Sequence, residues 1–489
     1  MVLRKMHWCV AGALLAVAGG VAAQQPLSLK EAASRAVLAN PEVLAKWHAF
    51  DAAAYERNVS WGGYLPTLDL VAGIGRTNLN DPLLSTEPKF NYDNVSLILR
   101  QMLFDGFATP NDVKRLDHAR RVRYFELMDV SESAALEAVR AYQDVLRYQT
   151  LVDYAEENYA QHKMVYDQIA ERTKSGVSRG VDLETASGRL ALAESNLLVD
   201  VANLHDVSAR FQRIVGGKPG TLVEQPKSLS DNLPATPIDG LKRTLDKSPQ
   251  LMAAMENIQA AQSDVNVRRS AYYPRLDFRL QRDEGQNLGG ILGRNENTTA
   301  ELTLRYNLFN GKRDDARINQ YTQNVNVAKD QRDKVCRDIR QTLLIALNDV
   351  GKLKEQVGYL DQHQLATDKS RQAFRNQFDI GQRTLLDLLD TENEYFQARR
   401  AYTNGERDLE TAYARVQAAT GDLLNVLGIK AVEPNTPQEV EAKGDDVLAR
   451  CPAEGLDLPL VDKAKAVEKA LRLRPARPAG TIGAPPAKR

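Results

Sequence analysis

The sequence predicts a mainly α-helical protein with a membrane β-barrel portion, built from two copies of one unit. A helix–strand–strand–long helix–helix pattern occurs twice, long stretches lack Gly and Pro, and short strands carry apolar residues on one face. Charged residues make up 26% of the chain and aromatic residues 6%, a balance typical of long helices rather than one thick core. Lys plus Arg equals Asp plus Glu at 64 each, so no strong net charge indicates a nucleic-acid partner.

Residues 1–23 have the layout of a secretory signal peptide. Arg4 and Lys5 supply the positive end, an apolar run follows, and Val21-Ala22-Ala23 offers a cleavage site. An uncleaved anchor is the competing interpretation, but the run is short for a bilayer span. Beyond this run no stretch approaches the roughly 18 apolar residues of a transmembrane helix, so none is predicted.

The first unit, residues 24–216, begins with a helix that leads into two strands. Ser28 and Glu31 predict a capping-box start, and Pro41 breaks the helical run and restarts it. Two stretches then follow in which every second residue is apolar, and this period of two is typical of a strand. The apolar positions are Leu68, Leu70, Ala72 and Ile74 in the first strand, and Leu97, Leu99 and Leu103 in the second.

A long helical hairpin completes this unit. Residues 111–173 contain neither Pro nor Gly, which predicts a helix on the order of 90–100 Å long. Gly176 predicts the hairpin turn, because glycine readily adopts the left-handed conformation that ends a helix. A second helix then extends to Val215, where glycines end it.

The same pattern recurs in residues 241–421, after a Pro-containing linker or equatorial segment at 217–240. The matching positions are Tyr273-Pro274-Arg275-Leu276-Asp277 with 65–69 at an offset of 208, and Gly381 with Gly176, Asp387 with Asp182 and Gly421 with Gly216 at an offset of 205. Residues 422–462 are an irregular C-terminal equatorial segment. Residues 463–489 are rich in Lys, Arg, Pro and Ala, which predicts a disordered tail.

The four strands fit a membrane better than a soluble sheet. Roughly ten residues of apolar and polar alternation suit a membrane-spanning strand, although a half-buried soluble strand is the alternative for any one of them. Aromatic residues near the strand ends suit a membrane interface. Four strands cannot close a barrel, and an open edge is not viable in lipid, so several chains must contribute. Two chains would give eight strands, and three would give twelve, enough for a lumen.

Four stretches resemble those of TolC-type outer membrane channel proteins. Two are the paired blocks Leu65-Pro66-Thr67-Leu68-Asp69 and Tyr273-Pro274-Arg275-Leu276-Asp277. The others are Leu308-Phe309-Asn310-Gly311 and Gly381-Gln382-Arg383-Thr384-Leu385-Leu386-Asp387-Leu388-Leu389-Asp390. The resemblance covers residues 27–425. It implies a homotrimer with one 12-stranded barrel in outer-membrane lipid, continuing as an α-helical tunnel into the periplasm. It also implies a periplasmic adaptor and an inner-membrane ABC or proton-driven pump as partners, with proteins, drugs or metals as cargo. The chain lacks a cysteine placed for lipid attachment, which favours the branch serving type I secretion.

Four residues near the second turn match gate positions of this family. Asp387 and Asp390 match the acids that ring the periplasmic entrance, where three copies would place six carboxylates around one axis. Asp387 has the counterpart Asp182, so helix capping explains it equally well. Asp390 aligns with Thr185, which favours a pore role.

Two further residues belong to the expected gate. Arg383 and Phe378 match positions where the family makes closing contacts between neighbouring helices. Gly381 is the expected turn of the second hairpin, as Gly176 is of the first.

The sequence shows no Ser/His/Asp set, Cys/His set or metal-ligand spacing, so no enzyme, cofactor or metal site is predicted. Cys336 and Cys451 are expected to be free thiols, with a single bridge between them as the alternative. The leading interpretation is an outer-membrane exit duct, gated at the periplasmic helix tips. A periplasmic adaptor or coiled-coil scaffold without a pore is the alternative, and the four amphipathic strands favour the duct.

Overall fold

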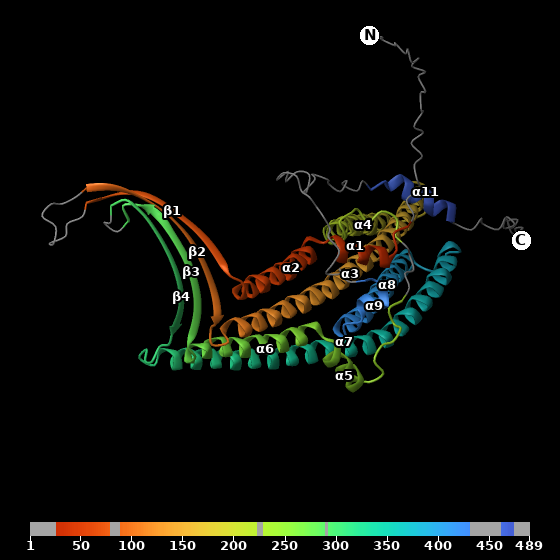
Figure 1. Ribbon diagram of the computed structural model, residues 1–489. Coiled ribbons are helices and arrows are strands. Elements are labelled where there is room, and N and C mark those ends of the chain that lie inside the picture. The colour runs from red at the N-terminus through yellow and green to blue at the C-terminus, as the bar shows by residue number, and fades with distance from the viewer. Residues whose placement is uncertain (1–25, 79–88, 223–227, 289–291, 431–460, 474–489) are drawn as a thin grey trace, which may run out of the picture.

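The computed structural model describes residues 26–78, 89–222, 228–288, 292–430 and 461–473. The predicted signal peptide and Cys451 lie outside these ranges, and so does most of the C-terminal equatorial segment. Long helices extend from one end of a curved four-stranded sheet (Figure 1). Among the described residues, none of the helices combines the length and hydrophobicity needed to cross a bilayer.

The two units follow the same order of elements. The first contains α1 (Leu29–Ala39), α2 (Pro41–Trp61), β1 (Thr67–Asn78), β2 (Lys89–Phe104), α3 (Ala108–Lys174) and α4 (Gly180–Val215). The second contains α5 (Pro237–Lys247), α6 (Pro249–Arg269), β3 (Arg275–Gln286), β4 (Arg294–Arg305), α7 (Arg313–Asp379) and α8 (Leu385–Ala419). Two short helices follow, α9 (Leu423–Leu427) and α11 (Lys463–Leu473). The long helices α3 and α7 each have 67 residues, so each is about 100 Å long.

The helix starts follow local sequence chemistry. The backbone N–H of Glu31 donates to the Ser28 hydroxyl, and the Glu31 carboxylate accepts from the Ser28 N–H, which completes the predicted capping box. Pro41 begins α2 directly after α1 ends, so the predicted break is confirmed. Helix α3 begins three residues before the predicted 111, because Pro110 lies in its first turn, where a missing N–H costs no hydrogen bond.

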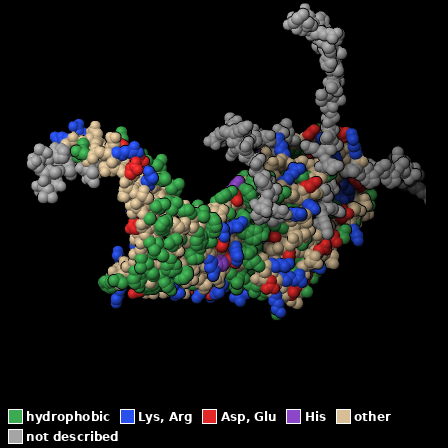
Figure 2. All heavy atoms as spheres, in the orientation of Figure 1, with side chains coloured by type: hydrophobic (Ala, Val, Ile, Leu, Met, Phe, Trp, Pro, Cys, Tyr) green, Lys and Arg blue, Asp and Glu red, His purple; other side chains and the backbone are tan. Residues whose placement is uncertain are grey.

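The four strands form one antiparallel sheet in the order β1–β2–β3–β4. Its register places alternate residues of all four strands on the same face. One row across the sheet consists of Leu68, Leu99, Leu280 and Ala300. The adjacent row, which faces the opposite side, consists of Thr67, Arg100, Arg279 and Glu301. The apolar and polar alternation read from the sequence is therefore a property of the whole sheet, and Figure 2 shows hydrophobic side chains gathered over it.

The sheet is open within one chain. In the described residues, β1 pairs only with β2, and β4 pairs only with β3. Strand β4 ends at Arg305, so Tyr306 and Leu308 lie beyond it. Their side chains are exposed, as is that of Phe309.

The core lies around the middle of α3, where the two equatorial segments return to the helices. Its largest cluster joins α1, α3 and α4 to Leu222 and Leu229 of the first segment and to α9 of the second. The Leu27 N–H donates to the Thr221 carbonyl at 2.8 Å, which holds the residues just before α1 beside the linker. The long helices are unequally covered, since α3 buries 21 side chains and α7 buries 7.

The prediction of a disordered tail from residue 463 is wrong for its first eleven residues. Residues Lys463–Leu473 form α11, which packs against α3. Alanines and leucines give this short segment a good helix propensity, and packing supplies the support that a helix of this length lacks in water. Residues 474–489 lie outside the described chain. Cys336 forms no disulfide within the described chain.

One carboxyl group lies inside this core. The Glu132 side chain of α3 is buried beside the first turn of α9, where the N–H groups of Leu424 and Leu423 face it. Burial raises its pKa to about 7, and the nearby Asp422 acts in the same direction. The hydrogen bonds from the two N–H groups oppose this rise without cancelling it.

We predict that Glu132→Gln removes a pH-dependent loss of stability. Below about pH 4.5 the Glu132 carboxyl is protonated in both the folded and the unfolded chain, so its burial does not lower the free energy of unfolding. As pH rises from there to about 7, the unfolded chain ionises first and the folded state loses at most about 3 kcal/mol. The free energy of unfolding in urea should therefore be equal for the two proteins at pH 4 and higher for the variant at pH 8. A difference that does not change with pH would contradict this assignment.

Candidate functional site at the helical hairpin tips

The two hairpins, α3–α4 (the first) and α7–α8 (the second), end in equivalent turns. Gly176 has a φ of 77° and Gly381 a φ of 79°, both in the left-handed region that favours glycine. The N–H of Val177 donates to the Arg172 carbonyl, and that of Gln382 to the Gln377 carbonyl, both at 2.8 Å. These bonds satisfy carbonyls at the last turn of each long helix. The turns therefore lie at matching positions, 205 residues apart.

Asp387 caps the start of α8. Its backbone N–H donates to the Thr384 hydroxyl at 3.2 Å, and its carboxylate accepts from the Thr384 N–H at 3.2 Å. The hydrogen bonds from Thr384 lower the Asp387 pKa, with a smaller contribution from Arg383. The carboxylate is therefore ionised at neutral pH while it performs a structural task. In the first hairpin Asp182 accepts from the Arg179 N–H at 3.3 Å in the same way.

Asp390 points to the other hairpin. Its carboxylate accepts from the Arg189 guanidinium of α4 at 2.5 Å, and 54% of the side chain remains exposed. His162 of α3 lies close to this pair and is buried. Burial lowers the pKa of His162 to about 4, and the positive charge of Arg189 adds to this effect. The imidazole is therefore neutral at physiological pH, and the Asp390 carboxylate has Arg189 as its cationic partner.

Phe378 and Arg383 have different environments. Phe378 is buried in a cluster that contains residues of all four long helices. The Arg172 guanidinium lies 5.5 Å from the centroid of its ring, a cation–π distance. Arg383 instead lies on its own hairpin, with its guanidinium 4.2 Å from the Phe374 ring centroid and its Nε donating to Gln377 at 3.0 Å. The structure thus brings Phe378 between the hairpins and leaves Arg383 on the second one.

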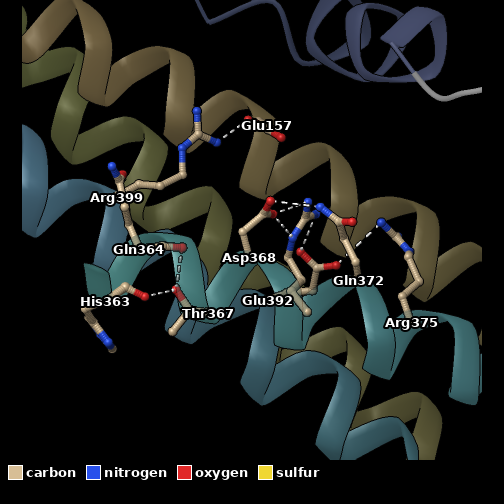
Figure 3. A network of polar contacts seen from close by, with 10 residues as sticks. Glu157, His363, Gln364, Thr367, Asp368, Gln372, Arg375, Glu392 and Arg399 are labelled. Atoms are coloured by element: carbon tan, nitrogen blue, oxygen red, sulfur yellow. Dashed lines mark hydrogen bonds and ion pairs between the residues drawn. The ribbon is translucent and has the colours of Figure 1, made fainter. Parts of the chain in front are cut away.

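A buried polar network joins the two helices of the second hairpin (Figure 3). Glu392 of α8, only 5% exposed, lies 3.5 Å from Arg371 and 3.5 Å from Arg375, both of α7. Burial raises the Glu392 pKa, while the two arginines oppose the rise. Arg371 also donates to Asp368 at 2.9 Å. The network therefore links α7 to α8 through charges that are largely shielded from water.

Two further ion pairs connect α8 to the first hairpin. Arg399 donates to Glu157 of α3 at 2.5 Å, and Arg400 donates to the buried Asp200 of α4. Together with Asp390–Arg189, they form a series of links between the hairpins of one chain. Such links fix the hairpins relative to each other through groups whose attraction depends on ionisation.

Sequence reasoning missed this network, although a signal was present. The equivalents of Arg371, Arg375 and Glu392 in the first hairpin, 205 residues earlier, are Tyr166, Ala170 and Ser187. A comparison of the two repeats position by position would have marked these charges as additions to the shared scaffold. The sequence did not indicate that the Phe378 ring would be buried, because isolated apolar residues occur throughout the hairpins. Among the described residues, no group of His, Cys, Asp and Glu is arranged to hold a metal ion.

A model of the outer membrane efflux protein family matches residues 32–217 and 240–422. The chain belongs to this family. The two matched segments correspond to the two repeats, with the linker between them. The resemblance to TolC-type channel proteins is thus confirmed.

Individual family members are distant in sequence. Outer membrane protein TolC of Escherichia coli (strain K12) is 20% identical and aligns with 90% of this chain and 91% of its own. Proteases secretion protein PrtF of Dickeya chrysanthemi is 21% identical over 84% of this chain and 91% of its own. The fold is similar to that of the CmeC outer membrane channel of Campylobacter jejuni, with a TM-score of 0.72 and 15% identity, covering 83% of this chain and 87% of that one.

These findings define the protein class and its place in the cell. The protein is an outer-membrane efflux or secretion channel that extends into the periplasm, as the sequence predicted. The family is one of channel proteins. The alternative of a pore-free adaptor has no support, since both repeats and their strands fall within the matched fold.

We predict that Glu392→Gln lowers the free energy of unfolding by about 2 kcal/mol. The change leaves Arg371 and Arg375 without their shared carboxylate, but Arg371 keeps Asp368, so the loss is smaller than the roughly 3–5 kcal/mol of a fully buried pair. Urea denaturation of the purified protein at pH 7 measures the change. Glu394→Gln is the matched control, since Glu394 is exposed two residues along α8, and it should stay within about 0.5 kcal/mol of wild type. Equal effects of the two changes would contradict a role for the network in stability.

Proposed function

We propose that three copies of this chain form one duct, a 12-stranded outer-membrane barrel that continues as a helical tunnel into the periplasm. The duct receives its cargo from an inner-membrane pump through a periplasmic adaptor, and serves type I protein secretion. Its periplasmic entrance is gated at the hairpin tips. The observation that carries this proposal is the open sheet of the single chain.

The free edges of β1 and β4 call for further strands. Unpaired backbone N–H and C=O groups cost several kcal/mol each in hydrocarbon, so a sheet in a bilayer must close on itself. Pairing β4 of one copy with β1 of the next satisfies both edges at once. Apolar side chains project near these edges, among them Leu308 at 87% and Phe309 at 81% exposure beyond β4, and Trp61 and Leu65 before β1. Three copies give twelve strands, enough to enclose an open lumen.

The exposure of α7 supports the same arrangement. This helix matches α3 in length but buries a third as many side chains within the chain. Several of its large apolar residues are exposed, including Ile345, Tyr359 and Leu365. A neighbouring copy beside α7 would cover this surface in the way that α6, α8 and α4 cover α3.

One observation favours protein secretion as the task. PrtF, which aligns with most of this chain, is by name a secretion protein for proteases.

The gate would consist of the residues at the second hairpin tip. Asp387 and Asp390 supply carboxylates at the entrance, Phe378 packs the hairpins together, and Arg383 stiffens the turn through Phe374. Asp387 is committed to capping α8, so the more adjustable charge is that of Asp390. Arg189 neutralises part of this charge within each chain.

We predict that the purified full-length protein is a trimer and conducts ions in planar bilayers. Closure of three open sheets supplies the physical reason. Light scattering in detergent and single-channel conductance measure the two properties. A monomeric protein that conducts no ions would contradict the proposed duct.

We predict opposite effects of changing the two members of the Asp390–Arg189 pair. Asp390→Asn should weaken block of the conducting channel by multivalent cations about fivefold, the factor that corresponds to one interaction of about 1 kcal/mol. Arg189→Gln should strengthen the block, because it frees the Asp390 carboxylate. Asp206→Asn, an exposed acid near the other end of α4, is the control and should change nothing. Unchanged block in both variants would show that Asp390 does not face the conduction path.

A further inference from the structure

A cavity of about 250 Å³ lies within one chain, where helices of the two units meet. Its walls come from α3, the start of α6, the middle of α7 and the last turn of α8. These helices lie side by side at the end of α6 that is far from the sheet (Figure 1). The polar residues that line the cavity include Asp129, Glu132, Ser133, Ser248, Thr342 and Arg415.

Glu132 brings an incompletely satisfied carboxylate to this cavity. Its side chain lines the cavity, although only 8% of the residue is exposed. The N–H groups of Leu424 and Leu423 donate to the carboxylate. One of its oxygens, Oε2, has no hydrogen-bond donor within the described chain. Because buried polar atoms are nearly always hydrogen-bonded, this oxygen calls for a donor from outside the chain.

A second carboxylate lies one helical turn away on α3. Asp129 also lines the cavity, and burial raises its pKa while Gln250 and Lys46 oppose the rise. Lys46 itself pairs with Glu126 at 3.2 Å. The salt bridges of the described chain include none to Asp129 or Glu132. The acidic wall of the cavity is therefore short of positive charge.

The basic residues of the cavity do not supply this charge. Arg140 pairs with Glu137 at 2.6 Å, and Arg415 pairs with Asp349 at 2.8 Å. Each guanidinium thus already has a carboxylate of its own. An anionic ligand would have to compete with those carboxylates, whereas a cationic ligand would meet two carboxylates that have no ion pair.

The two acids are not part of the duplicated scaffold. The positions equivalent to Asp129 and Glu132 in α7, 205 residues later, are Lys334 and Arg337. Both acids of α3 therefore correspond to bases in α7, so the fold of a long helix does not require carboxylates here. A buried carboxylate without a full set of partners lowers stability, and a ligand that pairs with it would restore what is lost.

The remaining lining indicates the kind of cation. Hydroxyl groups come from Ser133, Ser248 and Thr342, and apolar surface comes from Leu136 and Ile339. The volume is below the roughly 300–1,000 Å³ of pockets that take drug-sized ligands. Within the described chain, no three His, Cys, Asp or Glu side chains gather as metal ligands. An ammonium group on a short aliphatic chain suits both kinds of wall, since it donates hydrogen bonds and carries methylene groups.

We propose that this cavity binds a small aliphatic ammonium ion. Its ammonium group donates to the carboxylates of Glu132 and Asp129, and its aliphatic part lies against Leu136 and Ile339. The bound ion joins α3 to the start of α6 and the end of α8, so the bound protein resists unfolding more than the free one. The inference goes beyond the proposed function and does not depend on it, because every lining residue belongs to one chain and lies outside the sheet and the hairpin tips.

Putrescine (1,4-diaminobutane) serves as the probe, titrated into the full-length protein in a non-ionic detergent at pH 8 and constant ionic strength. At this pH the amines of putrescine are protonated, and the Glu132 carboxyl is mostly ionised. Calorimetry should show one putrescine bound per chain, and the melting temperature should rise with its concentration. 1,4-Butanediol has the same length without the charge, and should neither bind nor raise the melting temperature.

Four variants locate the binding. Glu132→Gln should weaken it at least about tenfold, because a charge-assisted hydrogen bond is lost. Asp129→Asn should weaken it about threefold, since Asp129 already accepts from Gln250. Ser133→Leu keeps both acids and fills part of the cavity, so it should also weaken binding. Glu394→Gln removes an exposed acid of α8 outside the cavity and should bind as wild type does.

The same measurements can overturn the proposal. Putrescine that does not bind, that binds Glu132→Gln as tightly as wild type, or that binds no better than butanediol would each do so, and water would then be the partner of Oε2. The duct is tested separately by light scattering and conductance. A conducting trimer that does not bind putrescine would overturn this inference alone, and a non-conducting monomer that binds it would overturn only the duct.

Discussion

A β-sheet in a bilayer cannot leave its edges unpaired, and this constraint governs the rest of the molecule. The chain contributes only four strands, in the order β1–β2–β3–β4, so its sheet is complete only beside other copies. The same incompleteness extends into the helices, because α7 exposes apolar surface where α3 is covered. The small number of strands and the exposed apolar surface of α7 therefore have the same explanation: the functional unit contains more than one chain.

The two halves of the chain share one scaffold but differ in the charges that they carry. Hairpin turns, capping aspartates and helix lengths recur at an offset of 205 residues. The buried charges around Glu392 do not recur. Shared features hold the fold together, whereas unshared charges determine how the hairpins attach to each other and which surfaces they present.

Much of the fold could be predicted because its signals are local. Glycines with positive φ mark both turns, Pro41 marks a helix boundary, and the alternation from Leu68 marks a strand. The polar network could not be predicted, since it depends on which faces of α7 and α8 meet. The tail from Lys463 was mispredicted for a related reason. Its charged composition suits disorder, and packing against α3 makes residues 463–473 a stable helix. At the candidate gate, the motif identified Asp390, but its partner Arg189 lies 201 residues away in sequence.

The equal length of α3 and α7 restricts how this protein can change over evolution. Seven residues inserted into α3 alone would displace Gly176 from the level of Gly381 by about 10 Å. The turns of the two hairpins would then end at different heights along the helix axes. The partner helix α4 would need the same insertion to keep its pairing, and α7 and α8 would have to follow. Tunnel length is thus a collective trait of four helices, open to change only by concerted steps. Sequence change elsewhere on the helices is not restricted in this way, which fits relatives that align with most of the chain at about one identical residue in five.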